Sequence, residues 1–250
     1  MPDRAEDAPQ RFGTGHARRM VHDFLLDALA VVLPLECAAC GVAASRSLCH
    51  ACTTELAAQA RMSRRVLGPP DDPLEVVTGA AYRGVVRRLV LALKEEGRLD
   101  ATAPLAALLR PALAAARDGG RAILAGPPSS YARRVRRGFD PVTVLVRAAG
   151  GGRVMSPLRR VRVSRDQVGL GRRERSGNLD GAFRARSSFD ATVELVLVDD
   201  VVTSGATLLE LRRAIRKAGG RVHAAVVLAG TPLRTGDGSS GGVLTPLGDA

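Results

Sequence analysis

Residues 193–210 read VELVLVDDVVTSGATLLE, and this stretch decides the fold of the chain. The apolar, β-branched run 193–198 predicts a buried strand, and two adjacent acids, Asp199 and Asp200, end it. A loop of small residues follows, and a helical pattern begins at Leu208. This order predicts an α/β fold with a parallel sheet, and a ligand site at the carboxyl end of the strand.

The loop after the two acids has the composition of an anion site. Residues 203–207 are small or carry hydroxyls, so backbone N–H groups can converge on a phosphate there. The next helix adds the N–H groups of its first turn. Two carboxylates would repel a phosphate in contact with them, so we expect them to face a neutral diol or a hydrated divalent cation. The alternative is a surface turn with an acidic strand end.

The stretch 196–208, VLVDDVVTSGATL, closely resembles the phosphoribosyl-pyrophosphate (PRPP) signature of type I phosphoribosyltransferases. The resemblance implies that Asp199 and Asp200 are the catalytic acids and hold the ribose 2′- and 3′-hydroxyls. It implies that the loop binds the 5′-phosphate of PRPP through Val201, Val202, Thr203, Ser204, Gly205, Ala206 and Thr207. The 6-oxopurine branch carries an acid at the position of Thr203, which argues against a hypoxanthine or guanine acceptor.

Four cysteines form two closely spaced CxxC pairs: Cys37, Cys40, Cys49 and Cys52. Two such turns supply the four thiolates of a tetrahedral zinc site. A redox pair or an iron–sulfur site is the alternative. We expect a structural zinc, with a small hairpin between the pairs, because the sequence offers no further donor for a catalytic site.

Length and composition bound the rest of the chain. Its 250 residues allow one α/β domain plus a small module, and 46% hydrophobic residues suffice for a core. No apolar run reaches the ~18 residues of a membrane span, and the charged N-terminus does not resemble a secretory signal. We therefore expect a cytoplasmic protein with no membrane insertion.

The net charge of +12 comes almost entirely from arginine, since the chain has two lysines, Lys94 and Lys217. The arginines gather at 133–137 and 159–175. A nucleic-acid or polyphosphate partner would use such charge. The alternative is a coding bias that favours arginine and alanine.

The predicted domain order follows from these motifs and from the Gly- and Pro-rich stretch 68–73. We expect a disordered N-terminus at 1–15, a module of helix and zinc ribbon at 16–67, a phosphoribosyltransferase-like domain at 74–230 and a disordered tail at 231–250. The elements expected from periodicity are helices at 16–33, 53–66, 84–93, 99–117, 141–149 and 208–218, and strands at 74–82, 121–125, 153–155 and 221–230. Pro111 should kink or split the helix that contains it. Asp140 is the expected N-cap of the helix at 141–149, since Pro141 suits its first turn.

The cysteine unit together with residues 82–98, YRGVVRRLVLALKEEGR, resembles the ComF family of phosphoribosyltransferase-like proteins, which are associated with natural competence. This resemblance implies that Lys94 points toward pyrophosphate; the alternative is a cation that stabilises a helix C-terminus. The resemblance extends to the loop at 126–130, in the position of a pyrophosphate loop, and to the Arg-rich stretch after it. It also implies that residues 159–186 form a basic flap over the substrate; the alternative for these residues is a solvated loop. The candidate pyrophosphate ligands are Ser129, Ser130, Arg133, Arg134, Lys94 and Arg175.

The sequence therefore predicts binding of PRPP with Mg²⁺ and transfer of ribose 5-phosphate to an unknown nitrogen acceptor, with release of pyrophosphate. The alternative is a protein of this fold that acts in competence and DNA uptake by binding single-stranded DNA or partner proteins. A regulatory binder of PRPP or nucleotides is a third hypothesis. Candidate partners are PRPP or a nucleotide, single-stranded DNA, and competence or helicase proteins.

Overall fold

The computed structural model describes residues 35–117, 122–128, 131–161, 179–231 and 245–246, and describes 131–133 and 245–246 by their backbone. The helix expected at 16–33, the disordered N-terminus at 1–15 and the central part of the flap lie outside the described residues.

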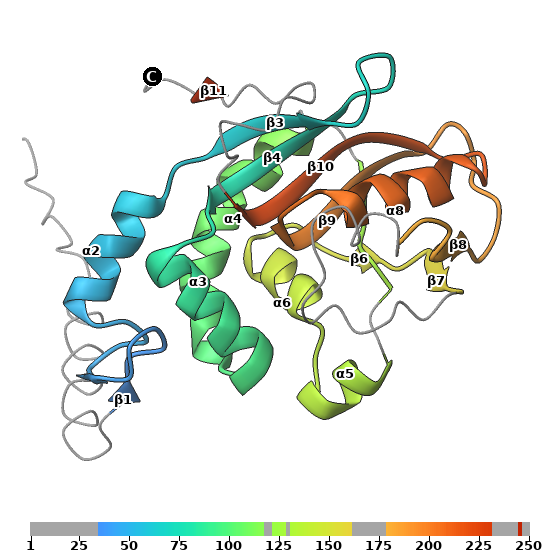
Figure 1. Ribbon diagram of the computed structural model, residues 1–250. Helices are drawn as coiled ribbons and strands as arrows, with labels where there is room; N and C mark the ends of the chain where they lie inside the picture. Colours follow the sequence, from blue (N-terminus) through green and yellow to red (C-terminus); the bar gives the residue numbers. More distant parts are fainter. Residues whose placement is uncertain (1–34, 118–121, 129–130, 162–178, 232–244, 247–250) are drawn as a thin grey trace, which may run out of the picture.

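A mostly parallel sheet forms the centre of the molecule (Figure 1). β4, β10, β9, β5 and β6 run parallel, while β3 and β11 pair antiparallel at one edge. Across the described residues the order is β11 (Thr245–Pro246), β3 (Ser63–Leu67), β4 (Leu74–Ala81), β10 (Arg221–Gly230), β9 (Glu194–Val202), β5 (Ile123–Ala125) and β6 (Val154–Met155).

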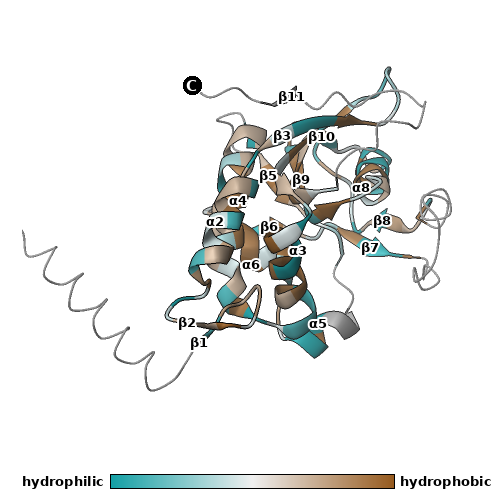
Figure 2. Ribbon diagram, turned by 60° about the vertical axis from the view of Figure 1, so that its left-hand side comes forward, coloured by the Kyte–Doolittle hydropathy of each residue, from teal (hydrophilic) through white to brown (hydrophobic). Residues whose placement is uncertain are grey.

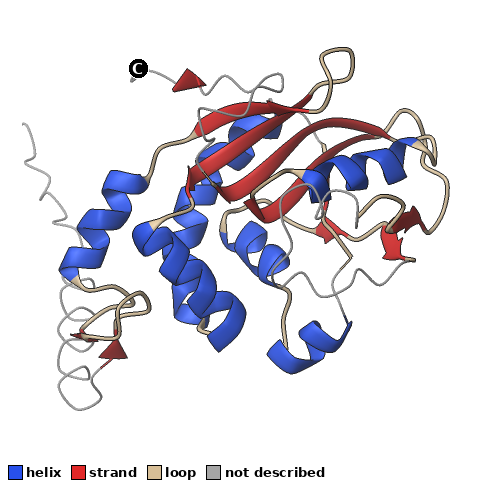
Figure 3. Ribbon diagram, in the orientation of Figure 1, coloured by secondary structure: helices blue, strands red, loops and turns tan. Residues whose placement is uncertain are grey.

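Helices cover both faces of this sheet, as Figure 3 shows by element type. α4 (Thr102–Arg117) contacts β4 and β10, and α6 (Pro141–Ala148) contacts β9 and α4. α8 (Ala206–Arg216) contacts β9 and β10 together with the hairpin of β7 (Leu158–Arg160) and β8 (Phe183–Ala185). In Figure 2 the strands lie between α4 on one side and α8 on the other, and brown, hydrophobic segments run through the central strands.

Alternating side chains divide the sheet between two apolar cores, as the twofold period of a strand requires. In β9, Val196 and Val198 pack into the core under α4 and α6, while Leu195 and Leu197 pack into the core under α8. Burial on both faces explains why this strand reads as a continuous apolar run. The sequence prediction of an α/β fold with a parallel sheet is confirmed.

The connections place the carboxyl ends of β5 and β9 at a switch point. The chain leaves β5 through α5 (Tyr131–Arg137) and α6 toward β6, and leaves β9 through α8 in the opposite direction toward β10. Open α/β sheets bind ligands in the crevice that such a reversal leaves. The fold therefore puts the predicted acids and loop where a ligand site is expected.

Several local predictions need correction. The helix expected at 53–66 runs from His50–Gln59 as α2, and β3 follows it, paired with β4 across the loop 68–73. Pro111 lies inside α4 without splitting it. Thr245–Pro246 forms β11 within the tail expected to be disordered. The division of the chain into a zinc-ribbon module and a larger domain stays a prediction.

Within the described residues, no helix combines the length and the apolar character needed to cross a membrane.

Candidate functional site

The four cysteines come together at the amino-terminal end of the described chain. β1 (Leu35–Glu36) and β2 (Ala43–Ala44) pair antiparallel around the first CxxC turn, in which the Gly41 N–H donates to the Cys37 carbonyl over 2.9 Å. Cys49 precedes α2, and Cys52 lies in its first turn. The four sulfurs lie within 4.8 Å of one another. The cluster can therefore bind a metal ion such as zinc.

The thiol chemistry fits a cation. Burial raises the pKa of Cys37, but hydrogen bonds from backbone groups such as that of Cys49 lower it more, to about 6. Burial and the neighbouring thiols raise the pKa of Cys52 to about 12. Four close sulfurs thus resist ionising together unless a positive charge compensates them, as a tetrahedral metal ion does. The redox alternative is not needed to explain this geometry.

The second site lies at the carboxyl end of β9. Asp199 and Asp200 are partly buried, and the Asp200 N–H donates to Oδ1 of Asp199 over 2.9 Å. Nζ of Lys94 lies 2.9 Å from Oδ2 of Asp200. The structure thus brings together three residues that the sequence placed in one site, although Lys94 and the acids are more than a hundred positions apart.

Lys94 projects from a π-helical turn, Ala92–Glu96, that continues α3 (Gly84–Leu91). Single π-helical turns occur often at functional sites. Burial lowers the pKa of Lys94, but Asp200, Asp199 and Tyr82 together raise it by more, so the pKa lies above its ordinary value. Lys94 is therefore a cation that contacts the acid pair.

The pKa of Asp199 is strongly raised. Burial and the charge of Asp200 raise the pKa of Asp199 to about 7, although Lys94 opposes this shift. Perturbed carboxylates of this kind gather at functional sites. A carboxyl group with a pKa near neutrality, such as that of Asp199, can exchange a proton for a cation or a polar ligand at physiological pH.

The loop after the acids lines a pocket. Its wall contains Leu179 and Asp199 together with Val201, Val202, Thr203, Ser204, Gly205, Ala206, Thr207 and Leu208. Gly205 has φ +80°, and a Cβ atom there would overlap the side chain of Leu67. A glycine is therefore required for both conformation and space at the turn into α8. The loop and Asp199, predicted as separate parts of one site, share this pocket.

The predicted pyrophosphate residues are described unequally. Ser129, Ser130 and Arg175 lie outside the described residues, and Arg133 is described by its backbone in α5. Arg134 is exposed on the same helix. The Arg-rich helix α5 lies after β5, and α6 follows it. Asp140, the predicted N-cap of α6, accepts a hydrogen bond from the Thr143 N–H over 2.9 Å.

Three contacts were missed by sequence reasoning. Glu95 lies 3.5 Å from Arg136 and 3.3 Å from Arg137, which ties the π-helical turn to α5. Leu179 lines the pocket, and Leu67 packs against Gly205 from a strand that was expected to be a helix. The position of Glu95 directly after Lys94 was the sequence signal that could have pointed to it. The other two contacts depend on tertiary packing.

No protein-family model matches the chain. The chain is similar to the DNA utilization protein YhgH of Salmonella typhimurium (strain LT2), with 30% identity over 193 residues, which cover 73% of this chain and 85% of that protein. It is equally similar to the DNA utilization protein YhgH of Salmonella typhi, with 30% identity over 193 residues.

Proposed function

Because this chain belongs to the family of the DNA utilization protein YhgH, we propose that it acts in the utilization and uptake of DNA, by binding single-stranded DNA or partner proteins. The similarity over 85% of that relative is the observation that carries the proposal. The resemblance to competence-associated ComF proteins and the net charge of +12 support it. Candidate protein partners are competence proteins and helicases.

The pocket after β9 supports a second proposal, that the protein binds PRPP or a nucleotide. The loop 203–207 and the first turn of α8 hold the 5′-phosphate, and Asp199 and Asp200 hold the ribose hydroxyls. Lys94 stands beside the acids, where it can turn to a pyrophosphate group. Under this proposal the larger domain has the type I phosphoribosyltransferase fold, which the parallel sheet and its switch point support.

Phosphoribosyl transfer is the reaction that such a site would perform. A nitrogen nucleophile forms a bond to C1 of the ribose, the bond from C1 to the pyrophosphate oxygen breaks, and pyrophosphate leaves with the electron pair. The acids orient the sugar and Lys94 stabilises the leaving anion. Bound Mg²⁺ would neutralise further phosphate charge. The acceptor is unidentified, and candidates include nucleobases and amines.

The four cysteines are proposed to hold a structural zinc ion. The donor set of four thiols within 4.8 Å supports this assignment, and a reducing, cytoplasmic location would keep them as metal ligands. The zinc unit would then supply a docking surface for DNA or a partner.

DNA binding is tested by a gel shift with labelled single-stranded DNA at several salt concentrations. We expect binding that persists at about 150 mM salt, with an affinity that falls as the salt concentration rises. Arg134→Ala/Arg136→Ala should weaken it about tenfold and flatten the salt slope by roughly one phosphate contact per arginine. Arg221→Ala, at the amino end of β10, is the matched control. An equal loss of affinity in the α5 variant and in Arg221→Ala would show that the arginines of α5 do not form the DNA-binding surface.

Ligand binding is tested by calorimetry with PRPP and Mg²⁺. Asp199→Asn/Asp200→Asn should abolish the heat of binding, while Asp190→Asn, which changes an exposed acid before β9, should leave it unchanged. A screen of nucleobases and amines with pyrophosphate detection then tests turnover. Unchanged binding in the double variant would exclude this pocket as the PRPP site.

A further inference from the structure

The four-cysteine cluster and the pocket after β9 are joined by a continuous set of contacts. Cys52, Glu55 and Gln59 lie at helical spacing on α2, so they share the face that packs on α3. Cys52 is a cluster thiol, and the two polar residues contact the first turn of α3. One helix face therefore serves both the metal-binding cluster and the start of α3.

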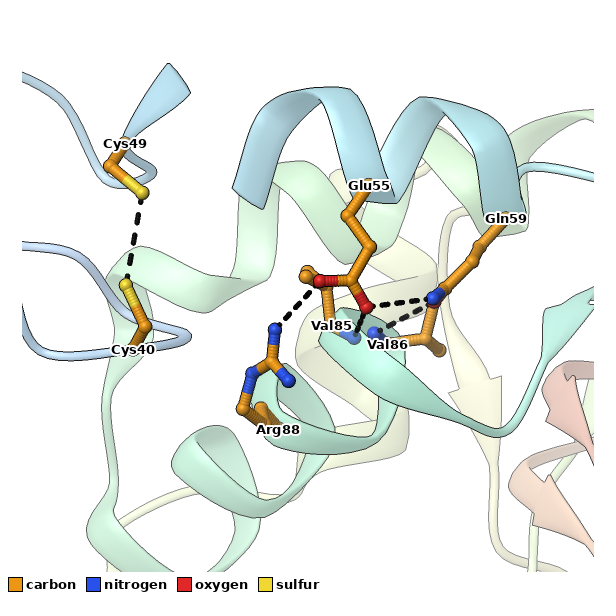
Figure 4. Close-up of polar contacts among 7 residues, drawn as sticks. All are labelled: Cys40, Cys49, Glu55, Gln59, Val85, Val86 and Arg88. Atoms are coloured by element: carbon orange, nitrogen blue, oxygen red, sulfur yellow. Dashed lines mark hydrogen bonds and ion pairs between the residues drawn. The ribbon is translucent and has the colours of Figure 1, made fainter. Parts of the chain in front are cut away.

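The start of α3 depends on α2 for its cap. Arg83, its N-cap residue, makes no side-chain cap hydrogen bond among the described residues. Oε1 of Glu55 instead accepts from the Val85 N–H over 2.9 Å, and Oε1 of Gln59 accepts from the Val86 N–H over 3.3 Å (Figure 4). These two acceptors satisfy first-turn N–H groups that a helix leaves unpaired, and the carboxylate meets the positive end of the helix dipole.

The backbone is shaped for this close approach. Gly84, the first residue of α3, has φ +48°, and a Cβ atom there would overlap the side-chain ends of Glu55 and Gln59. The Gln59 amide donates to Oε1 of Glu55 over 2.9 Å, which holds the two acceptors together. The cap is therefore a built contact between two helices.

Arg88 links this cap to the cysteines. Its guanidinium lies 2.9 Å from Oε2 of Glu55. Glu55 first, and then the Cys52 sulfur, raise the pKa of Arg88, so Arg88 interacts electrostatically with both residues of α2. Figure 4 shows Arg88 directed at the Glu55 carboxylate. A cluster of thiolates around a divalent ion has net negative charge, which an adjacent guanidinium stabilises.

The far end of the same helical segment reaches the pocket. α3 continues without a break into the π-helical turn that carries Lys94, whose Nζ contacts Asp200. The ten steps along the helix from Gly84 to Lys94 span roughly 15 Å at helical rise. Fixing the first turn of this segment fixes the axis along which Lys94 projects.

We propose that Glu55 is a positioning residue for the pocket, and that it couples the state of the four-cysteine cluster to the contact between Lys94 and Asp200. With metal in the cluster, Cys52 and Arg88 hold α2 in place, and Glu55 keeps α3 in register. Loss of the metal or of Glu55 releases the first turn of α3 and loosens Lys94 at its other end. This inference rests on the proposed role of the pocket, but its test does not need a ligand.

The test uses the fact that Lys94 and Lys217 are the two lysines of the chain. Reductive methylation of the full-length, zinc-loaded protein with ¹³C-formaldehyde gives NMR signals for both dimethylated lysines and for the N-terminal amine, which titrates separately. Lys217→Arg assigns the Lys94 signal, and Asp200→Asn gives its position when the ion pair is lost.

In Glu55→Ala we expect the Lys94 signal to move at least half of the way to its Asp200→Asn position, while the Lys217 signal stays. Removing zinc with a chelator should produce the same shift in the otherwise unchanged chain and no further shift in Glu55→Ala. Glu55→Gln keeps the acceptor for Val85 and should recover most of the original position. Glu194→Ala, which changes an exposed glutamate at the start of β9, is the matched control.

A second measurement follows zinc directly. Competition with a chromogenic chelator should show about tenfold weaker zinc binding in Arg88→Met, since partners of metal ligands have effects of this order. A Lys94 signal that is unchanged in Glu55→Ala and after zinc removal overturns the inference, whether or not the protein binds PRPP. Conversely, a shift in Lys94 together with no PRPP binding supports the coupling and removes the proposed ligand.

Discussion

The first turns of α3 and α8 solve the same problem in opposite ways. Each helix begins at or beside a glycine with positive φ, Gly84 and Gly205. In the described structure the N-cap of α3, Arg83, makes no side-chain cap hydrogen bond, and the N-cap of α8 is Gly205, which has no side chain. At α3 the protein fills the position with a carboxylate of its own, Glu55. At α8 a pocket lies in front of the first turn, and Ser204 Oγ accepts from the Ala206 N–H at 3.4 Å.

The two ends also differ in the state of their carboxylates. The Val85 N–H and Arg88 lower the pKa of Glu55, so its charge is favoured where it sits. Burial and Asp200 raise the pKa of Asp199 to about 7, so its charge is disfavoured. A carboxylate whose charge is favoured suits a structural contact such as a helix cap, whereas a carboxylate that is costly to ionise is typical of functional sites.

The largest expected effect is that of a side chain at the open helix end. Gly205→Ala forces a non-glycine residue to φ +80° and pushes its Cβ atom into Leu67. We expect a loss of about 2–4 kcal/mol in the free energy of unfolding, from strain and overlap together. Urea denaturation checks this. Gly219→Ala is the matched control, with φ +86° and a neighbour at 3.5 Å, and should cost about 1 kcal/mol.

Equal losses at the two glycines would mean that Leu67 yields freely and that β3 does not shape the pocket.

The acid pair should make stability depend on pH. The pKa of Asp199 lies near 7 in the folded protein, above its ordinary value of 3.8, so the folded state holds the proton more tightly. The stability from protonated Asp199 is fully present below about pH 4 and is lost as the pH rises through about 7. Asp199→Asn imitates the protonated form and should therefore gain about 1–2 kcal/mol above pH 7 and nothing below pH 4.

Thermal unfolding at pH 4 and pH 8 measures this difference, with Glu194→Gln, an exposed change at the start of β9, as the control. A variant that is equally stable to the parent at pH 8 would show that Asp199 is charged without cost, and the contrast with Glu55 would disappear.

Glu55 is expected to act in the opposite pH range. Its lowered pKa means that its contribution is present above its ordinary value of 4.5 and is lost as the pH falls through the folded value. Glu55→Ala should speed hydrogen exchange of the Val85 and Val86 amides roughly tenfold, as expected for a lost cap. The first-turn amides of α8 should keep their rates. Exchange measured by NMR separates these amides, and Thr54→Ala, an exposed change on α2, is the control.

Faster exchange at both helices in Glu55→Ala would indicate general loosening and would remove the distinction between the two ends.

The sequence was informative wherever chemistry is local. The run 193–198 and its two acids predicted β9 and its ligand end, and the CxxC spacing predicted the cysteine cluster, because both patterns lie within a few residues. Asp140 with Pro141 likewise predicted the start of α6. These signals need no knowledge of which segments pack together.

The sequence was least informative where distant segments meet. Residues 63–66 were expected to continue a helix, but pairing with β4 places them in β3, since tertiary contacts override weak local preference. Pro111 was expected to kink or split its helix, yet α4, which packs against β4 and β10, is not split there. The Glu55 cap joins positions thirty residues apart in sequence. The glycines at the two helix starts can be read from the sequence, but the side chains that pack against them, Glu55 and Gln59 at Gly84 and Leu67 at Gly205, cannot.

The smallest expected effect concerns Ser204. Its hydroxyl is the described side-chain acceptor at the start of α8, but the 3.4 Å contact with the Ala206 N–H is long for a hydrogen bond. Ser204→Ala should therefore change the free energy of unfolding by less than about 0.5 kcal/mol, below the usual cost of losing an N-cap. The same change should weaken PRPP binding severalfold if the hydroxyl donates to the phosphate. Parallel urea denaturation and calorimetry distinguish the two roles, because a structural cap would lower stability and leave affinity unchanged.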